Sequence, residues 1–412
     1  MRRSRLHTPK PHARPGETPD FSYLELSPAG VAPRPDINVR VRDINGLAYE
    51  LIRVLDDEHR AVGPWNPHLD PSELQVGLRH MMLTRAFDDR MQRMQRSGKI
   101  SFYMRSLGEE AVAVAQCMAL RPTDMLFPAY RQQGLYVVRG RPLVDLMCQL
   151  LSNTRDMCKG RQLPVMYHWR EGNIFSISGN LTTQFPQAVG WAMAAAIKGQ
   201  DDIAASWIGE GSSAEADFHH AMLFASVYRA PVILNVVNNQ WAISTFQGFA
   251  GGEHRSFAAR GPGFGMAGLR VDGNDFLAVY AATQWAAERA RMGAGATIME
   301  LVTYRAAAHS TSDDPSRYRP KDDYDRWPLG DPVERLKNHL IAIGEWSEDR
   351  HAALAAELDE HVTQSWRQAV TYGTLTEPPR LDPHLMFADV FKHMPEHLKK
   401  QEAQLHAELA GE

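Results

Sequence analysis

Two continuous apolar runs, residues 203–208 and 232–237, stand out in the hydrophobic and polar pattern of this chain. Such runs are typical of strands that are buried on both faces of a parallel sheet. The segment between them has helical spacing, so the pattern predicts a strand–helix–strand unit. The first run ends in Gly-Glu-Gly at 209–211, and the second ends in Asn238 and Asn239. A right-handed crossover brings both strand ends to one edge of the sheet, so we expect the two polar motifs to lie close together.

The same pattern predicts alternating strands and helices along most of the chain. Strands are expected at 125–127, 269–271 and 297–304, and helices at 72–97, 143–151, 188–197, 276–292 and 331–373, with a further helix of small residues ending at 120. This alternation predicts an α/β fold, a doubly wound and mostly parallel sheet flanked by helices. We expect an N-terminal arm and linker over residues 1–71, the α/β domain over 72–375, and a charged helical tail over 376–412.

Composition narrows the class of protein only a little. The 412 residues are 44% hydrophobic and 23% charged, which is ordinary for a globular protein. A net charge of −4 gives no reason to expect nucleic acid as a partner. No run reaches the roughly 18 apolar residues of a membrane-spanning helix, so no membrane association is expected. Cys117, Cys148 and Cys158 lack C-x-x-C spacing, which is typical of buried thiols in a reducing compartment.

The turn after the first apolar run has the chemistry of a phosphate site. Glycines let the backbone approach a phosphate closely, and free N–H groups at the following helix start attract anions. A carboxylate at position 210 would repel a phosphate directly, so a bridging cation is expected. Magnesium prefers hard oxygen ligands, some of them from substrate phosphates. Glu210 offers a carboxylate and Asn239 offers an amide oxygen.

The two motifs together resemble the thiamin diphosphate fingerprint, G-[DE]-G followed by N-N. The 26 residues 212–237 lie between the motifs, which is the family spacing. A lone G-x-G is weak evidence, but both ends at this spacing on suitable elements are specific. The resemblance implies thiamin diphosphate and magnesium, with Glu210, Asn239 and the backbone carbonyl of Trp241 as metal ligands. The residues implied along the diphosphate are Gly209, Gly211 and Ser212.

Other segments resemble the alpha subunits of the 2-oxo acid dehydrogenase complexes. The matching segments are ISFYM at 100–104, GEE at 108–110, KGRQ at 159–162, TQFPQAVG at 183–190 and HSTSDD at 309–314. Each of them is similar to the branched-chain group, the 2-oxoisovalerate dehydrogenases. The resemblance covers roughly residues 72–375, and the N-terminal arm resembles bacterial members loosely.

This resemblance implies the oxidative decarboxylation of branched-chain 2-oxo acids, with transfer of the acyl group to a lipoyl group. The chain carries one fingerprint, as an alpha subunit does. The implied partners are a beta subunit, in an α2β2 heterotetramer, and a lipoyl-bearing acyltransferase. The implied location is the bacterial cytoplasm, or the mitochondrial matrix for a eukaryotic chain.

Further site residues follow from the same resemblance. Tyr130 and Arg131 match a pair that contacts the diphosphate, and a guanidinium suits phosphate oxygens. His309 matches a histidine that acts on the intermediate and the lipoyl thiol, and a near-neutral imidazole can move protons. We expect Arg305 to support the loop of His309. Ser310 matches a serine that is phosphorylated in animal relatives, although their second phosphorylation site is Pro320 here.

The expected substrate pocket is formed by Phe102, Tyr130, Gly179 and Leu181, the last two also lying against the cofactor. For Phe102 and Leu181, plain core packing is the competing interpretation, because a pocket for branched aliphatic acids is itself apolar. Gly179 stands where relatives carry Ser, and its missing hydroxyl leaves room for a branched group.

A second cation site is implied in the loop before the helix at 188–197. Its expected ligands to potassium are Ser178, Asn180, Thr183 and Gln184. Their hydroxyl, amide and carbonyl oxygens suit a hard monovalent cation. An Asn/Thr turn that caps the following helix explains the same residues equally well.

One position departs from the branched-chain pattern, since Val237 stands where relatives can carry an arginine that reaches the diphosphate. Binding must then depend more on Arg131 and the metal, or another basic residue must compensate. Two alternatives to the branched-chain assignment remain at this point. One is an alpha subunit acting on pyruvate or acetoin, and the other is a non-catalytic nucleotide-binding module on a similar sheet.

Overall fold

A six-stranded sheet, parallel throughout, forms the centre of the computed structural model, which describes residues 6–254 and 256–411. The strand order is β1-β7-β8-β4-β3-β2. The strands are β1 (Leu51–Ile52), β2 (Met125–Phe127), β3 (Ala204–Gly209), β4 (Val232–Asn238), β7 (Ala267–Asp272) and β8 (Thr297–Val302). All seven residues of β4 are buried, as the continuous apolar run predicted. The predicted α/β class is confirmed.

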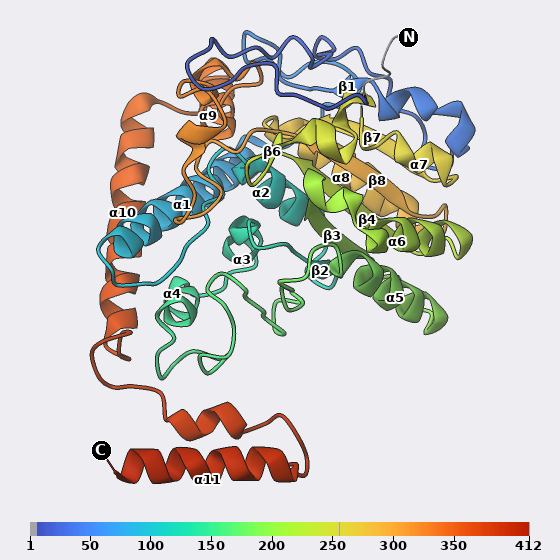
Figure 1. Cartoon of the computed structure of the whole chain (residues 1–412). Coiled ribbons are helices and arrows are strands. Elements are labelled where there is room, and N and C mark those ends of the chain that lie inside the picture. Colours follow the sequence, from blue (N-terminus) through green and yellow to red (C-terminus); the bar gives the residue numbers. More distant parts are fainter. Residues whose placement is uncertain (1–5, 255, 412) are drawn as a thin grey trace, which may run out of the picture.

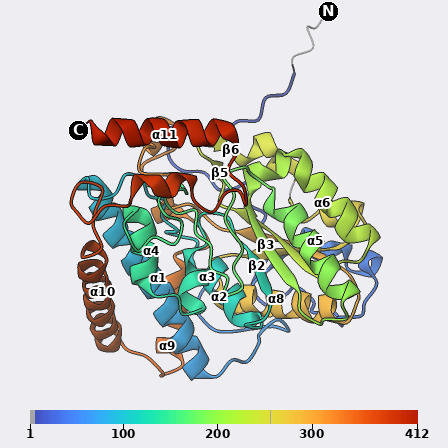
Figure 2. The ribbon, with the colours of Figure 1, turned by 90° about the horizontal axis from the view of Figure 1, so that it is seen from below.

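Helices cover both faces of this sheet (Figures 1 and 2). The helices are α1 (Pro71–Arg96), α2 (Glu110–Ala119), α3 (Gln133–Val138), α4 (Leu143–Leu151), α5 (Gln184–Ile197), α6 (Ala216–Val227), α7 (Arg260–Gly263), α8 (Phe276–Arg291), α9 (Pro332–Ala342), α10 (Glu348–Val370) and α11 (Glu396–Ala410). Alternate residues of β4 belong to different cores. Ile233 and Val237 pack in the core with α1, α2 and α8, while Leu234 and Val236 pack in the core with α5 and α6.

Local sequence signals set the helix starts. Asp70 and Glu73 form a capping box at the start of α1, with Pro71 in the first turn. Asp331 caps α9 by accepting the backbone N–H groups of Val333 and Glu334. The predicted helical region 331–373 is thus divided, with α10 starting separately at Glu348. Within the described ranges, no helix has the length and apolar character needed to cross a bilayer.

The N-terminal arm lies against the loops that follow β4 and β8. The Phe21 ring contacts the Tyr304 and Trp327 rings edge-on, with centroids 5.7 and 5.2 Å away. The Tyr23 hydroxyl donates to Gln240 Oε1 over 3.1 Å. By contrast, α11 lies at the end of the molecule away from β1 and contains no buried residue (Figure 1).

Several elements differ from their predicted bounds. The helix expected at 188–197 starts at Gln184, so two residues expected at the potassium site lie at its start. A short 3-10 helix, Glu210–Ala214, separates β3 from α6. The sequence did not predict β1 or α3, because two and six residues are too short to show a period.

Candidate active site

A cavity of about 540 Å³ opens at the carboxyl edge of the sheet. Its lining comes mainly from the loops that follow β2, β3, β4 and β8 and from the loops before α2 and α5. The register of the strands explains this convergence. Gly209 pairs with Val237 and Asn238 pairs with Val302, so three strands end at the same level. The two polar motifs of the fingerprint therefore meet, as predicted.

Most of the residues expected at the site line this cavity. Those that do are Tyr130, Arg131, Ser178, Gly179, Leu181, Gln184, Gly209, Glu210, Gly211, Ser212, Asn239, Trp241 and His309. Val237 also lines the cavity. Phe102, Asn180 and Thr183 do not line it among the described residues.

Glu210 is a buried carboxylate with an unused oxygen. The residue is 1% exposed, and its Oε1 has no hydrogen-bond partner in the described part of the chain. Burial raises the pKa of this carboxyl to about 7, and the nearby Glu109 carboxylate also raises it. A buried, unpaired carboxylate oxygen is costly unless a ligand completes it. This oxygen fits a cation.

Asn239 presents its amide to the same region. Its Nδ2 donates to Glu109 Oε1 over 2.8 Å, and its Oδ1 accepts the backbone N–H of Trp241 at 3.3 Å. The Trp241 carbonyl accepts from Arg305 Nη1 at 2.7 Å, which leaves its second lone pair. Carboxylate, amide and carbonyl oxygens are the donor set that magnesium prefers.

The turn between β3 and α6 is shaped for close approach. A Cβ at Gly211 would lie 2.4 Å from the Ala242 Cβ, so no larger residue fits without movement. The Thr182 hydroxyl donates to the Ser212 carbonyl over 2.7 Å. This bond links the loop before α5 to the Gly-Glu-Gly turn.

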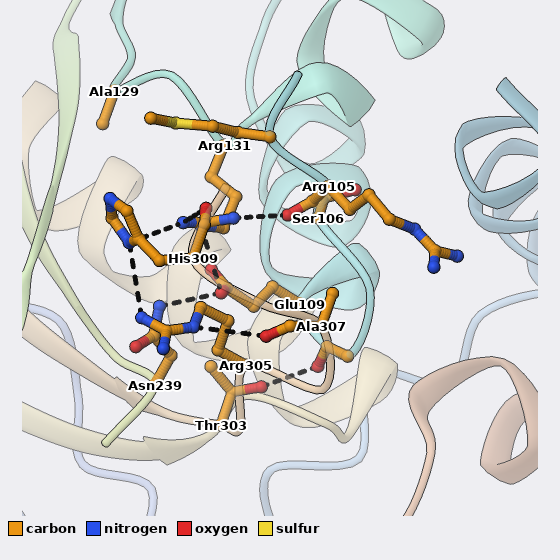
Figure 3. A network of polar contacts seen from close by, with 12 residues as sticks. Arg105, Ser106, Glu109, Ala129, Arg131, Asn239, Thr303, Arg305, Ala307 and His309 are labelled. Carbon is orange, nitrogen blue, oxygen red and sulfur yellow. Dashed lines mark hydrogen bonds and ion pairs between the residues drawn. The ribbon is translucent and has the colours of Figure 1, made fainter. Parts of the chain in front are cut away.

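Arg131 and His309 form the other polar side of the cavity (Figure 3). Arg131 Nη2 donates to the His309 carbonyl over 2.9 Å and lies 3.2 Å from His309 Nδ1. Arg305 Nη1 lies 3.3 Å from the same Nδ1. Since both neighbours can only donate, Nδ1 accepts and the neutral ring carries its proton on Nε2. Burial, Arg131 and Arg305 lower the pKa of His309 to about 3.

Sequence comparisons agree with this geometry. The family model described as "Dehydrogenase E1 component" matches residues 78–377, and the model "2-oxoisovalerate dehydrogenase E1 alpha subunit N terminal" matches residues 2–41. The chain belongs to the dehydrogenase E1 component family. The family implies thiamin diphosphate as the cofactor.

Relatives within the E1 family place the chain more closely. It is 59% identical to the 2-oxoisovalerate dehydrogenase subunit alpha of Pseudomonas aeruginosa, over 97% of this chain and 98% of that protein. It is 38% identical to the human mitochondrial subunit, over 88% of this chain and 81% of the relative. The Arabidopsis thaliana mitochondrial subunit alpha 1 is 36% identical, over 86% of this chain and 74% of that protein. Each of these relatives is named as an alpha subunit, and such a name implies a beta subunit as its partner.

Charge in the cavity bears directly on the E1 cofactor. Among the described lining residues, Arg131 is the only arginine or lysine, facing the carboxyl groups of Glu109 and Glu210. With Val237 at the position where an arginine can stand, this lining cannot attract a diphosphate by itself. A divalent cation held by the Glu210 carboxylate would offset this repulsion. Arg305 does not line the cavity and uses its guanidinium to hold the carbonyls of Trp241 and Ile243.

Some of the residues expected at the substrate and potassium sites do not line the cavity. Phe102 packs half-buried against the main core, and Met104 lines the cavity instead. The Ser178 Oγ accepts the backbone N–H of Asn180, and the Thr183 hydroxyl donates to the Asn180 carbonyl. These bonds lie within the loop before α5 and do not cap the helix, since Thr183 is the N-cap residue and makes no side-chain cap bond. Gln184 Oε1 is buried and has no described partner.

Sequence reasoning missed two features of this E1 site. Glu109 is 3% exposed and contacts both Asn239 and Arg131, and burial raises its pKa to about 7. Its only sequence signal was the GEE segment. The second feature is an apolar rim, in which Leu181, Ile243 and Phe249 remain 48%, 55% and 56% exposed.

Proposed function

We propose that this chain is the alpha subunit of a 2-oxoisovalerate dehydrogenase. The reaction is the oxidative decarboxylation of branched-chain 2-oxo acids, with transfer of the acyl group to a lipoyl group. The single observation that carries the proposal is the unpaired Glu210 oxygen facing a cavity that it shares with Asn239, at fingerprint spacing. The identity with relatives of that name supports the branched-chain assignment.

In this proposal, Glu210, Asn239 and the Trp241 carbonyl hold magnesium. Backbone groups of Gly209, Gly211 and Ser212 lie along the diphosphate, and the Arg131 guanidinium neutralises part of its charge. Thiamin diphosphate, when bound, supplies a nucleophilic carbon and an electron sink.

His309 acts at the reacting centre as a hydrogen-bond donor. Its Nδ1 faces two guanidinium groups, so the neutral ring presents Nε2–H, which can hold an oxygen of the acyl group or a sulfur of the lipoyl group by a hydrogen bond. The low pKa keeps the ring neutral at physiological pH. The Tyr130 ring meets the imidazole edge-on, at 5.9 Å between centroids, and limits its movement.

The exposed rim supports completion of the site by another chain. Leu181, Ile243 and Phe249 line the cavity and are about half exposed, and a dry pocket requires these side chains to be covered. A second apolar face lies on α5 and α6, where Ile197, Val227 and Tyr228 are more than half exposed. We propose that the beta subunit covers the rim in an α2β2 heterotetramer, which then acylates a lipoyl-bearing acyltransferase.

The substrate side chain is proposed to lie against Leu181, Tyr130 and the open position at Gly179. No atom lies within 4 Å of a Cβ built at Gly179, so this side of the cavity has room for a branched group. Potassium at Ser178, Asn180, Thr183 and Gln184 also remains a proposal. Its support is the unpaired Gln184 oxygen.

Two measurements on the complex with its beta subunit test the function. Calorimetry is expected to show thiamin diphosphate binding that depends on magnesium, and rates are expected to be higher with 3-methyl-2-oxobutanoate or 4-methyl-2-oxopentanoate than with pyruvate. A preference for pyruvate would replace the branched-chain assignment. Binding of ATP or NAD in place of thiamin diphosphate would favour a nucleotide-binding module.

A further inference from the structure

Glu109 connects the two polar sides of the cavity. It directly precedes α2, and its carboxylate lies between Asn239 and Arg131 (Figure 3). Oε1 accepts the Asn239 Nδ2–H at 2.8 Å and lies 3.6 Å from Arg131 Nε. Glu109 is 3% exposed, Asn239 is 7% exposed and Arg131 is 5% exposed, so water competes little for these contacts.

The contact with Asn239 decides which end of an amide faces the metal site. An amide can present either its oxygen or its NH2 group, and only the oxygen binds a cation. Oε1 of Glu109 also lies beside the Arg131 guanidinium, which only donates, so this oxygen acts as an acceptor and pairs with the NH2 end. The Asn239 oxygen is then turned to the side where Trp241 N–H and the cavity lie.

The contact between Glu109 and Arg131 affects the side of the cavity that Arg131 and His309 form, where the diphosphate is proposed to bind. The Arg131 head also donates to the carbonyls of Arg105 and His309, at 2.6 and 2.9 Å. Glu109 supplies the only carboxylate that pairs with this guanidinium among the described residues, and it holds Nε while Nη2 reaches the loop of His309.

We propose that Glu109 is a positioning residue for both halves of the magnesium–diphosphate site: it orients the Asn239 amide and holds Arg131. The proposal rests on the proposed function and extends it to a residue that touches neither metal nor phosphate. Outer-sphere partners of this kind typically change metal affinity roughly 10- to 100-fold when removed.

The neighbouring residue supplies a matched control. Glu110 is also fully buried, but its carboxylate accepts from Arg85 Nε at 2.8 Å and from the Gly108 N–H at 2.9 Å, and it does not line the cavity. Glu110→Gln therefore removes a buried charge at the same helix start without touching Asn239 or Arg131.

The first experiment measures the magnesium concentration that gives half-maximal thiamin diphosphate binding, by calorimetry on the complex with the beta subunit. Glu109→Ala is expected to raise it roughly 10- to 100-fold. Glu109→Gln retains an acceptor but loses the charge, so its effect is expected to be smaller. Glu110→Gln is expected to stay within about twofold of wild type. An equal change for Glu109→Gln and Glu110→Gln would assign Glu109 a merely structural role.

A charge swap then tests whether Glu109 orients the Asn239 amide. Asn239→Asp places two carboxylates in contact, which repel each other. Adding Glu109→Gln restores a donor–acceptor pair, because the Gln amide can donate to the new carboxylate. The same Glu109→Gln substitution is thus expected to weaken magnesium binding roughly tenfold in the wild-type background and to strengthen it in the Asn239→Asp background. Additive losses in both backgrounds would overturn the proposal.

The swap also has a readout that needs no cofactor. In the unliganded complex, Glu109→Gln is expected to raise the melting temperature of the Asn239→Asp variant while lowering or leaving that of the wild type. Absence of this sign change would contradict the pairing of Glu109 with Asn239. If the wild-type complex binds no thiamin diphosphate, the proposed function fails instead, and the melting temperatures still decide the pairing.

Discussion

The floor and the rim of the cavity differ in how much of their chemistry this chain completes. On the floor, Glu109, Glu210, Arg131 and Asn239 are each less than a tenth exposed, and Glu109 pairs with both Asn239 and Arg131. On the rim, Leu181, Ile243 and Phe249 are about half exposed. Within the described part of the chain, Glu210 Oε1 of the floor has no hydrogen-bond partner, and the rim side chains are not covered.

This difference follows from the elements that carry each part. Glu210 and Asn239 follow β3 and β4, whose parallel register fixes their separation. The rim residues lie on loops, which adapt to whatever packs against them. The floor therefore suits an invariant group such as a metal diphosphate, and the rim suits the parts that differ between complexes, the acyl chain and the partner subunit.

The largest expected effect is at the floor. Glu210→Gln keeps the shape of the side chain but removes the carboxylate, so magnesium-dependent cofactor binding is expected to weaken by at least roughly 100-fold, more than a typical outer-sphere change. Since the unpaired carboxylate oxygen is a cost without a metal, the melting temperature of the unliganded complex should not fall. Calorimetry measures the cofactor affinity, and thermal unfolding measures the melting temperature. The control is Glu215→Gln, an exposed glutamate five residues further on; wild-type affinity in Glu210→Gln would remove the metal assignment.

At the rim, the expected effect is on assembly and not on the metal. Phe249→Ser removes a half-exposed aromatic side chain, and aromatic residues often dominate interface energies. Affinity for the beta subunit is expected to fall roughly tenfold, by sedimentation or light scattering across a dilution series. Met292→Ser, at an equally exposed position that does not line the cavity, is the control. Unchanged assembly in Phe249→Ser would show that the beta subunit lies elsewhere.

The pKa of His309, which contacts Arg131 of the floor, gives a further test. Its pKa is lowered to about 3, so between that value and the usual 6.5 the unfolded chain binds a proton that the folded chain does not. Stability is therefore expected to be lost as the pH falls below about 6.5, and His309→Asn should lose less between pH 7 and pH 5. Arg131→Met is expected to move the pKa of His309 back toward 6.5. Melting temperatures at the two pH values and NMR of labelled histidine rings test these expectations; a ring that titrates near 6.5 in the wild type would contradict them.

The sequence predicted the floor better than the rim, for a physical reason. β3 and β4 are long enough to appear as apolar runs, and the motifs at their ends lie within one strand–helix–strand unit. Glu109 and Asn239 are 130 positions apart, and nothing local records that they meet. The sequence did not predict the rim, because Ile243 and Phe249 belong to no motif. Only the structure shows that these side chains are exposed. Phe102 matched a family pattern but packs against the core, which a pattern cannot distinguish from a pocket.

The smallest expected effect is on the choice of substrate. This effect distinguishes the substrate side of the cavity from the magnesium site on the floor. Gly179→Ser adds a hydroxyl where a Cβ meets no atom within 4 Å, so folding and magnesium affinity should be unchanged. The hydroxyl occupies space on the substrate side, and one methylene in a pocket is worth roughly 1–3 kcal/mol. The rate ratio of 3-methyl-2-oxobutanoate to pyruvate is therefore expected to fall roughly fivefold, which corresponds to the lower end of that range. Phe102→Leu, outside the cavity, should leave that ratio within about twofold. If Phe102→Leu changed the ratio more than Gly179→Ser, the substrate would contact the segment around Phe102, and specificity would not belong to the rim.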